Sequence, residues 1–188
     1  MRDRSFLRSP AILVWLLAVS ACSPPPDPRR TNFEIKTKDL YAKYDSKTGR
    51  LKKIDIDADK NGKMDTFSYW DGTRLDRIEI DRDEDGRIDR WEHYDEKNKL
   101  TRIGSSNKDD QVEDTWSYPD AQGFLMRVES DLDRDGVLDK RETFEPRPGV
   151  PDGRALVMVE LDFDPAGRPG LRMHYNPDGS FLKSEVLR

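Results

Sequence analysis

The chain has very few of the residues that build common metal and redox centres. Its 188 residues include one cysteine, Cys22, and two histidines, His93 and His174. A single cysteine excludes an internal disulfide, and the histidines stand far apart, outside any cluster with metal-ligand spacing. The sequence also lacks a G-x-S-x-G motif and a phosphate-binding glycine loop. These absences argue against the common hydrolase and nucleotide-binding classes, and we expect both histidines on strand surfaces.

Apolar residues are scarce as well. Hydrophobic residues make up 34% of the chain and charged residues 38%, against about 25% charged in a typical globular protein. A formal net charge of −5 argues against a nucleic-acid partner. Such a composition fits either a partly disordered chain or a thin repeat that buries only narrow apolar seams.

The N-terminal segment has the layout of an export signal. Three arginines precede an apolar run at 11–18, and small residues at 19–21 lead to Cys22. The run is too short for a comfortable transmembrane helix. The segment resembles the bacterial lipobox, which implies cleavage before Cys22, acylation of Cys22 and a membrane anchor. An ordinary cleaved signal with a free cysteine is the alternative.

These features predict three parts of the chain. Residues 1–21 form the signal peptide, residues 22–31 form the lipidated cysteine with a proline-rich tether, and residues 32–188 form one repeat domain. The residue after the cysteine is Ser23 and not aspartate, and in this respect the chain resembles lipoproteins that reach the outer membrane. We therefore expect a lipid-anchored envelope protein, in the outer membrane rather than the inner.

A repeat of about 25 residues runs through the predicted domain. Its marker position is occupied by Asp57, Asp81, Ser106, Asp131 and Asp162, with spacings of 24, 25, 25 and 31 residues. The last spacing contains an insertion at about 145–152. Leucine stands six residues before every marker, and isoleucine or valine stands three before it. A conserved spacing of this kind within one chain is typical of repeat architectures.

Each unit is predicted to form two short strands. Residues before the marker alternate between apolar and charged, which is the period of a half-buried strand. Aromatic and alternating residues predict second strands at 66–70, 90–94, 115–118 and 140–144. The predicted fold is all-β, an antiparallel meander of about five 24–25-residue β-hairpin repeats, ten to twelve strands in all, forming an elongated sheet. The turn phrase Y-D…G-x-L resembles YD-type or MORN-like β-hairpin repeats.

Acidic loops connect the two strands of each unit. Residues 81–92 and 131–142 match the calcium loop of the EF-hand family, with acidic residues at positions 1, 3, 5, 9 and 12 and glycine at position 6. Alternate residues of a tightly curled loop point their carboxylates inward, where calcium takes six to eight oxygens. The predicted ligands are Asp81, Asp83, Asp85, the carbonyl of Arg87, Asp89, Glu92, Asp131, Asp133, Asp135, the carbonyl of Val137, Asp139 and Glu142, with a weaker set at Asp57, Asp59, Asn61 and Asp65.

The spacing excludes a true EF-hand, because only 12 or 13 residues separate successive loops and two helices do not fit there. We therefore rely less on Glu92 and Glu142 than on positions 1, 3, 5 and 9. The third and fifth loops have lost ligand positions. The simplest alternative is that the aspartates and glycines only make good turns.

The sequence thus favours a non-enzymatic envelope lipoprotein with calcium-stabilised repeats, acting as a structural or binding module for another envelope protein or a glycan. A metal-independent interaction scaffold is the second hypothesis, and a hydrolase of a cell-wall or surface polymer is the third. The aromatic column Phe67, Trp91 and Trp116 is expected to pack within the sheet, with a partner- or glycan-binding stripe as the alternative.

Overall fold

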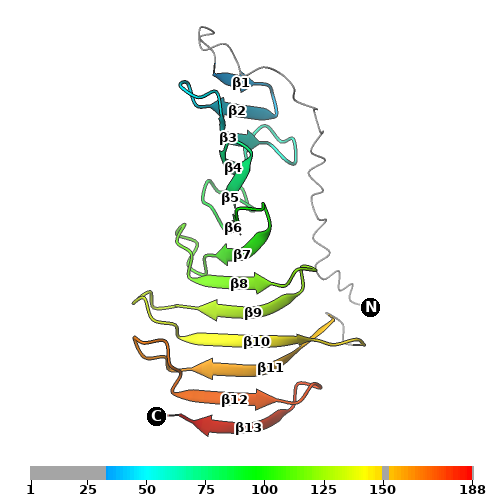
Figure 1. Ribbon diagram of the computed structural model, residues 1–188, viewed down its shortest axis with the longest axis vertical. Helices are drawn as coiled ribbons and strands as arrows, with labels where there is room; N and C mark the ends of the chain where they lie inside the picture. Colours follow the sequence, from blue (N-terminus) through cyan, green and yellow to red (C-terminus); the bar gives the residue numbers. More distant parts are fainter. Residues whose placement is uncertain (1–32, 150–152, 188) are drawn as a thin grey trace.

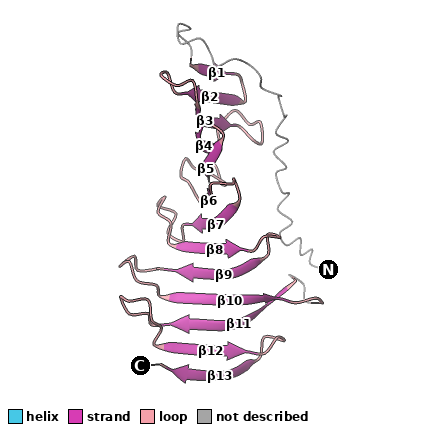
Figure 2. Ribbon diagram, in the orientation of Figure 1, coloured by secondary structure: helices cyan, strands magenta, loops and turns pink. Residues whose placement is uncertain are grey.

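The described part of the chain is a single antiparallel sheet of 13 strands, each hydrogen-bonded to the next in chain order (Figure 1). This computed structural model describes residues 33–149 and 153–187, and Figure 2 shows only strands and loops in them. The strands are β1 (Glu34–Lys36), β2 (Leu40–Tyr44), β3 (Leu51–Ile56), β4 (Thr66–Asp71), β5 (Arg74–Ile80), β6 (Arg90–Tyr94), β7 (Leu100–Ser105), β8 (Thr115–Pro119), β9 (Leu125–Ser130), β10 (Lys140–Pro146), β11 (Arg154–Leu161), β12 (Leu171–Tyr175) and β13 (Phe181–Val186).

This architecture confirms the predicted all-β meander of hairpin repeats. The structure has 13 strands where ten to twelve were expected, partly because β1 adds a short edge strand against β2. At the start of the predicted insertion, Glu145 and Pro146 extend β10, since they still pair with Ala155 and Arg154. The predicted signal peptide, Cys22 and the tether lie outside the described residues. No helix in the described ranges is long and apolar enough to cross a membrane.

The strand register carries the repeat across the sheet. One row of directly paired residues reads Ile54, Ser68, Ile78, Glu92 and Ile103. The neighbouring row, on the other face, reads Asp55, Phe67, Glu79, Trp91, Gly104, Trp116 and Glu129. Because side chains alternate between faces with period two, the isoleucines fall on one face and the aromatic–acidic row on the other, as the alternation predicts.

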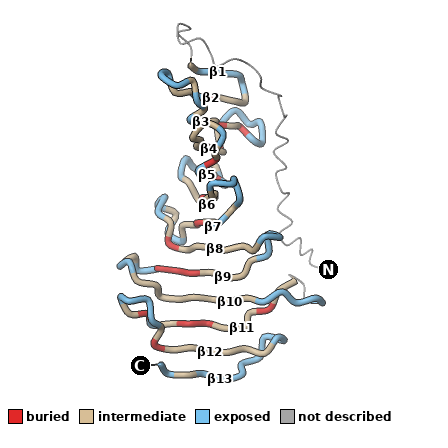
Figure 3. Tube along the Cα trace, in the orientation of Figure 1, coloured by how far each residue is buried: buried red, intermediate tan, exposed pale blue. Residues whose placement is uncertain are grey.

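The sheet is one layer thick, so its interior is thin (Figure 3). Among the residues that the structure describes, few apolar side chains are buried: Ala42, Leu75, Trp91, Ala155, Val159 and Phe163. Phe67 and Trp116 are only half-buried, and the Lys53 ammonium lies over the Phe67 ring at 4.9 Å from its centroid. Long charged side chains thus take the place of a second layer by covering apolar surface with their aliphatic stems.

Ion pairs connect neighbouring strands on the aromatic–acidic face. Arg141 on β10 donates to Glu129 on β9 at 2.8 Å and to Glu160 on β11 at 3.3 Å. Arg172 on β12 donates to the same Glu160 at 2.7 Å. Cross-strand pairs of this type contribute roughly 0.2–1 kcal/mol each, so the basic and acidic columns of the repeat stabilise the sheet along its length.

Candidate metal sites

The five acidic loops all lie along one edge of the sheet, the edge formed by the C-terminal ends of the odd-numbered strands β3 to β11. We number them in chain order: the first loop is residues 57–65, the second 81–89, the third 106–114, the fourth 131–139 and the fifth 162–170. Each follows an odd-numbered strand of a meander, and such strands all end at the same edge. In the lower half of Figure 1 the loops after β7, β9 and β11 lie together on the left.

Backbone hydrogen bonds connect neighbouring loops. The amide of Asp81, which opens the second loop, donates to the carbonyl of Asp65, which closes the first, at 2.9 Å. The amide of Asp131 donates to the carbonyl of Asp114 at the same distance. The ladder of the sheet therefore continues into the loops, and the loops are stacked at a fixed register.

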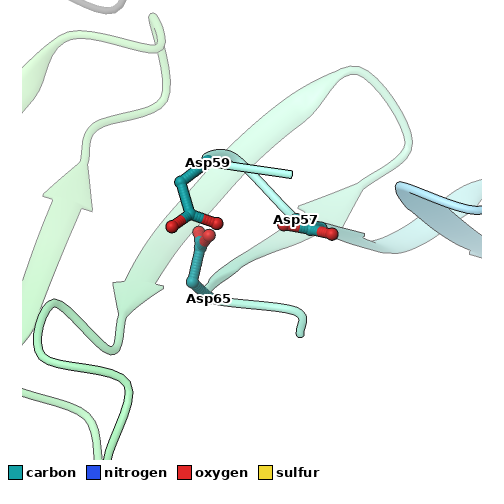
Figure 4. Close-up of side chains that lie close together, drawn as sticks. All are labelled: Asp57, Asp59 and Asp65. Atoms are coloured by element: carbon teal, nitrogen blue, oxygen red, sulfur yellow. The ribbon is translucent and has the colours of Figure 1, made fainter. Parts of the chain in front are cut away.

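The first loop gathers three aspartates, Asp57, Asp59 and Asp65, each with one carboxylate oxygen within 4.8 Å of the others. Figure 4 shows the carboxylates of Asp59 and Asp65 turned toward each other, with Asp57 beside them. Asp57 is 2% exposed and accepts hydrogen bonds from the amides of Asn61 at 3.0 Å and Gly62 at 2.7 Å. These bonds curl the loop around the carboxylate.

The second loop gathers Asp81, Asp83 and Asp85 within the same limit. The amide of Gly86 donates to Oδ2 of Asp81 at 2.9 Å. Oδ1 of Asp81 is buried without a hydrogen-bond partner, and the residue is 8% exposed. A buried carboxylate oxygen with no partner carries a large desolvation cost, and a cation in the cluster would relieve it.

The fourth loop gathers Asp131, Asp133 and Asp139. The amides of Arg134 and Gly136 donate to the two oxygens of Asp131 at 2.8 and 3.1 Å. The three-residue clusters differ in membership, because the second uses the fifth position and the first and fourth use the ninth. The other predicted ligands of these loops bind loop amides: Asp89 accepts from Arg82, and Asp135 accepts from Val137.

The spacing of the oxygens suits calcium. Calcium binds oxygen at about 2.3–2.6 Å, so two ligands of one ion lie at most about 5 Å apart. The clustered oxygens, all within 4.8 Å of one another, meet that limit without rearrangement of the loops. Glycine at the sixth position has a positive φ in all three loops, for example +92° at Gly86, which provides the sharp bend.

Glu92 and Glu142 lie on strands, and the three clusters do not include them. The carboxylate of Glu92 accepts from Arg90 at 2.7 Å and from the Tyr94 hydroxyl at 2.7 Å. Glu142 pairs with Lys140 at 3.2 Å. The structure therefore brings together three aspartates of each predicted set and leaves the two glutamates in pairs of their own on the sheet face. The carbonyls of Arg87 and Val137 remain predicted ligands.

The third loop contains an arginine. Asp114, with a side chain that is 0% exposed, pairs with Nη2 of Arg134 at 2.9 Å. The same guanidinium binds Asp110 through both Nη atoms, and this holds the pKa of Asp110 down at about 2. The sequence predicted the loss of metal ligands here but not the arginine, which comes from the fourth loop.

Arg134 belongs to a recurring feature. The fourth residue of each of the first four loops has a left-handed backbone, with φ of 66° at Lys60, 61° at Glu84, 49° at Asp109 and 68° at Arg134. The side chains of the last three reach the preceding loop. Glu84 binds the Asn61 amide group, and Asp109 pairs with Arg87 at 2.8 Å.

The described histidines occupy strand positions. Nε2 of His93 lies 2.8 Å from Glu113, and Nε2 of His174 lies 3.8 Å from Glu185. Glu113 is the eighth residue of the third loop and also accepts from the indole of Trp116 at 3.0 Å. Burial opposes the ionisation of Glu113, but the contacts with His93, Arg102 and Trp116 outweigh it and lower the pKa of the carboxyl.

Comparison with known proteins gives no family. No family model matches the chain, and no curated protein matches it. Similar solved structures include TarM (TM-score 0.31, 13% identity, 62% of this chain and 20% of that chain). They also include an S. aureus TarM mutant in complex with fondaparinux, α-GlcNAc-glycerol and UDP (TM-score 0.32, 11% identity, 69% of this chain and 22% of that chain). A third is accessory secretory protein 1, 2 and 3 of Streptococcus pneumoniae (TM-score 0.29, 14% identity, 58% of this chain and 18% of that chain). The chain spans about a fifth of the length of each, and TM-scores near 0.3 are too low to indicate a shared fold.

Proposed function

We propose that this protein is a non-enzymatic lipoprotein of the cell envelope, with a single-layer sheet stiffened by calcium along one edge. The observation that carries the metal part is the set of three aspartate clusters on that edge. The anchor rests on the N-terminal sequence, in which Cys22 ends a basic, apolar and small-residue signal. The sheet then serves as a structural element or as a binding surface for another envelope component.

The need for a cation follows from the charge of the loops. Among the described residues, the largest fully buried side chains are two aspartates, Asp57 and Asp114. Asp114 has the Arg134 guanidinium beside it, whereas Asp57 lies with Asp59 and Asp65. Carboxylates this close repel one another unless a proton or a cation lies among them. Calcium outside the cytosol is abundant enough to fill even weak sites of this kind.

Calcium titration of the full chain, purified in detergent, tests the metal. We expect heat of binding in calorimetry and a higher melting temperature with calcium than with chelator, because an ion that binds only the folded state stabilises it. The double variant Asp81→Ala, Asp131→Ala should lose most of this response. If neither heat nor melting changes with calcium, the loops are only turns and the metal-independent scaffold is the better description.

Fractionation of cells tests the anchor. The wild-type chain should sediment with membranes and incorporate labelled fatty acid, because two or more acyl chains hold a soluble domain stably on a bilayer. The Cys22→Ser variant should do neither. A wild-type protein that is exported but leaves the membrane fraction on washing would exclude the lipoprotein.

Pull-down from envelope extracts, with and without calcium, addresses the partner. A protein or glycan retained only with calcium would assign the sheet a calcium-dependent binding role, and one retained equally in chelator would favour the metal-independent scaffold. The half-buried Phe67 and Trp116 rings are the first positions to substitute in that assay. The polymer hydrolase remains the third hypothesis, and an assay of envelope polymers for cleavage tests it.

A further inference from the structure

Two carboxylate oxygens, one in the second loop and one in the third, are buried without a hydrogen-bond partner. One is Oδ1 of Asp81, which is one of the three clustered aspartates of this loop. The other is Oδ1 of Asp109, which belongs to the third loop and to the next repeat. Both oxygens have lost water without gaining a hydrogen bond, so both favour a nearby positive charge.

The second carboxylate is directed at the second loop by its backbone. Asp109 has φ of 49°, and Oδ2 of Asp109 lies 2.8 Å from Nη2 of Arg87, the seventh residue of the second loop. The same Nη2 also binds Asp85 of the cluster. One guanidinium therefore bridges a carboxylate of each repeat, and the space between the two loops already accommodates positive charge.

The charge of each fourth-position side chain complements the residues of the loop that it reaches. Glu84 and Asp109, both carboxylates, reach the first and second loops, which contain aspartate clusters. Arg134 reaches the third loop, where Ser106 and Lys108 replace ligands. An acidic side chain is thus supplied to the first and second loops, and a cationic side chain is supplied to the third loop, which has lost ligand positions.

We infer that the calcium site of the second loop is built from two repeats, with Asp109 of the third loop as an additional ligand beside the three aspartates of the second. This rests on the proposed function, since it takes calcium as the ion. Added carboxylates raise calcium affinity, and Asp109 supplies one that the strand-bound Glu92 does not. The ion bound at the second loop then also joins adjacent hairpins, so calcium stiffens the stack there as well as the loop.

Loop-resolved calcium titration tests this inference. The amides of Gly62, Gly86 and Gly136 each donate to the opening aspartate of a different loop, at 2.7, 2.9 and 3.1 Å. An ion on that aspartate polarises the bond, so the NMR shift of each glycine amide reports on one loop. The full chain in detergent is titrated with calcium chloride alone, and the midpoint is read at each glycine.

The variant is Asp109→Asn, which keeps the side-chain shape and tolerates a positive φ. We expect the midpoint at Gly86 to rise about tenfold, since a charged ligand is lost, while that at Gly136 stays within about twofold. The matched control is Asp76→Asn, which removes one charge from an exposed position on β5, where Asp76 pairs with Arg77 at 3.4 Å. It should leave all three midpoints unchanged.

The outcomes separate this inference from the proposed function. If none of the three glycines responds to calcium in the wild type, the calcium proposal fails. If Gly86 responds but Asp109→Asn behaves like Asp76→Asn, calcium binding stands and the ligand from the next repeat is refuted. Equal shifts at all three glycines in Asp109→Asn would indicate a general electrostatic or folding effect and would also refute it.

Discussion

Arg134 of the fourth loop pairs with the fully buried carboxylate of Asp114 in the third loop, with 2.9 Å between Nη2 and Oδ2. The two residues come from different repeats, so the pair joins two hairpins at the edge of the sheet. Asn107 also donates to Asp114 from its backbone amide at 3.0 Å and from its side chain at 2.7 Å. In the third loop, an arginine and an asparagine therefore bind the buried carboxylate, whereas the neighbouring second and fourth loops each bring three aspartates together.

Substitution of Arg134 by methionine should lower the melting temperature by several degrees, because it leaves the Asp114 carboxylate buried without its cation. Arg168→Met is the matched control. Arg168 pairs with Asp164, but its side chain is 78% exposed, and exposed pairs contribute little. Thermal melts with chelator present isolate the effect from calcium. Equal melting temperatures for the two variants would show that Arg134 does not hold the third loop.

The contact between Arg134 and Asp110 should make part of the stability depend on acid pH. The guanidinium lowers the pKa of Asp110 from 3.8 to about 2, so the folded state favours the charged form. The contribution is then present above about pH 4 and is lost as the pH falls through 2. The denaturation midpoints of wild type and Asp110→Asn should converge over that interval. A difference between them that stays constant down to about pH 2 would contradict the assigned shift.

The fold could be predicted from the sequence because each repeat forms its strands from residues that are close together in the chain. Strand β6 begins and ends at the predicted residues, 90 and 94, and β4, β8 and β10 begin where predicted and run one or two residues longer. Alternation with period two places Ile54 and Asp55 on opposite faces whatever the neighbouring strands are. The gathering of Asp57, Asp59 and Asp65 was likewise predictable, since all three belong to one short loop.

The contacts between loops were not predictable in the same way. Arg134 and Asp110 are 24 residues apart, and only the stacking of the loops brings them together. A signal is nevertheless present in the sequence: Lys60, Glu84, Asp109 and Arg134 occupy the same loop position. That position supplies no ligand within its own loop, so its contacts follow only from the stacking. The contact of Glu113 with His93 was equally unpredictable, because the two residues are 20 positions apart and only the stacking of the strands brings them together.

Gly104 leaves the space that Glu113 fills. A Cβ on Gly104 would lie 2.2 Å from Oε2 of Glu113 and 2.5 Å from its Cδ, so Gly104→Ala should push the carboxylate off His93 and Trp116. We expect a loss of about 1–3 kcal/mol in the free energy of unfolding. The loss should shrink in a Glu113→Ala background, where the clash is absent. Additive effects in denaturant unfolding of the single and double variants would show that the two residues do not interact.

Tyr69 should make the sheet sensitive to alkali. Its hydroxyl donates to Glu79 at 2.8 Å, and burial followed by this carboxylate raises the pKa of Tyr69 to about 12. Because the unfolded value is near 10, the folded state favours the neutral phenol. That contribution is present below about pH 10 and is lost as the pH rises toward 12.

The Tyr69→Phe variant lacks the titrating hydroxyl and serves as the reference. The free energy of unfolding of wild type should fall relative to that of the variant above about pH 10. The reason is that the unfolded wild type ionises Tyr69 there while the folded state holds the phenol neutral. In Glu79→Gln the tyrosinate absorbance should appear at lower pH than in wild type, since the neighbouring negative charge is gone. A Tyr69 that ionises near pH 10 in wild type would mean that the hydroxyl faces solvent and that Glu79 is held by Arg77 alone.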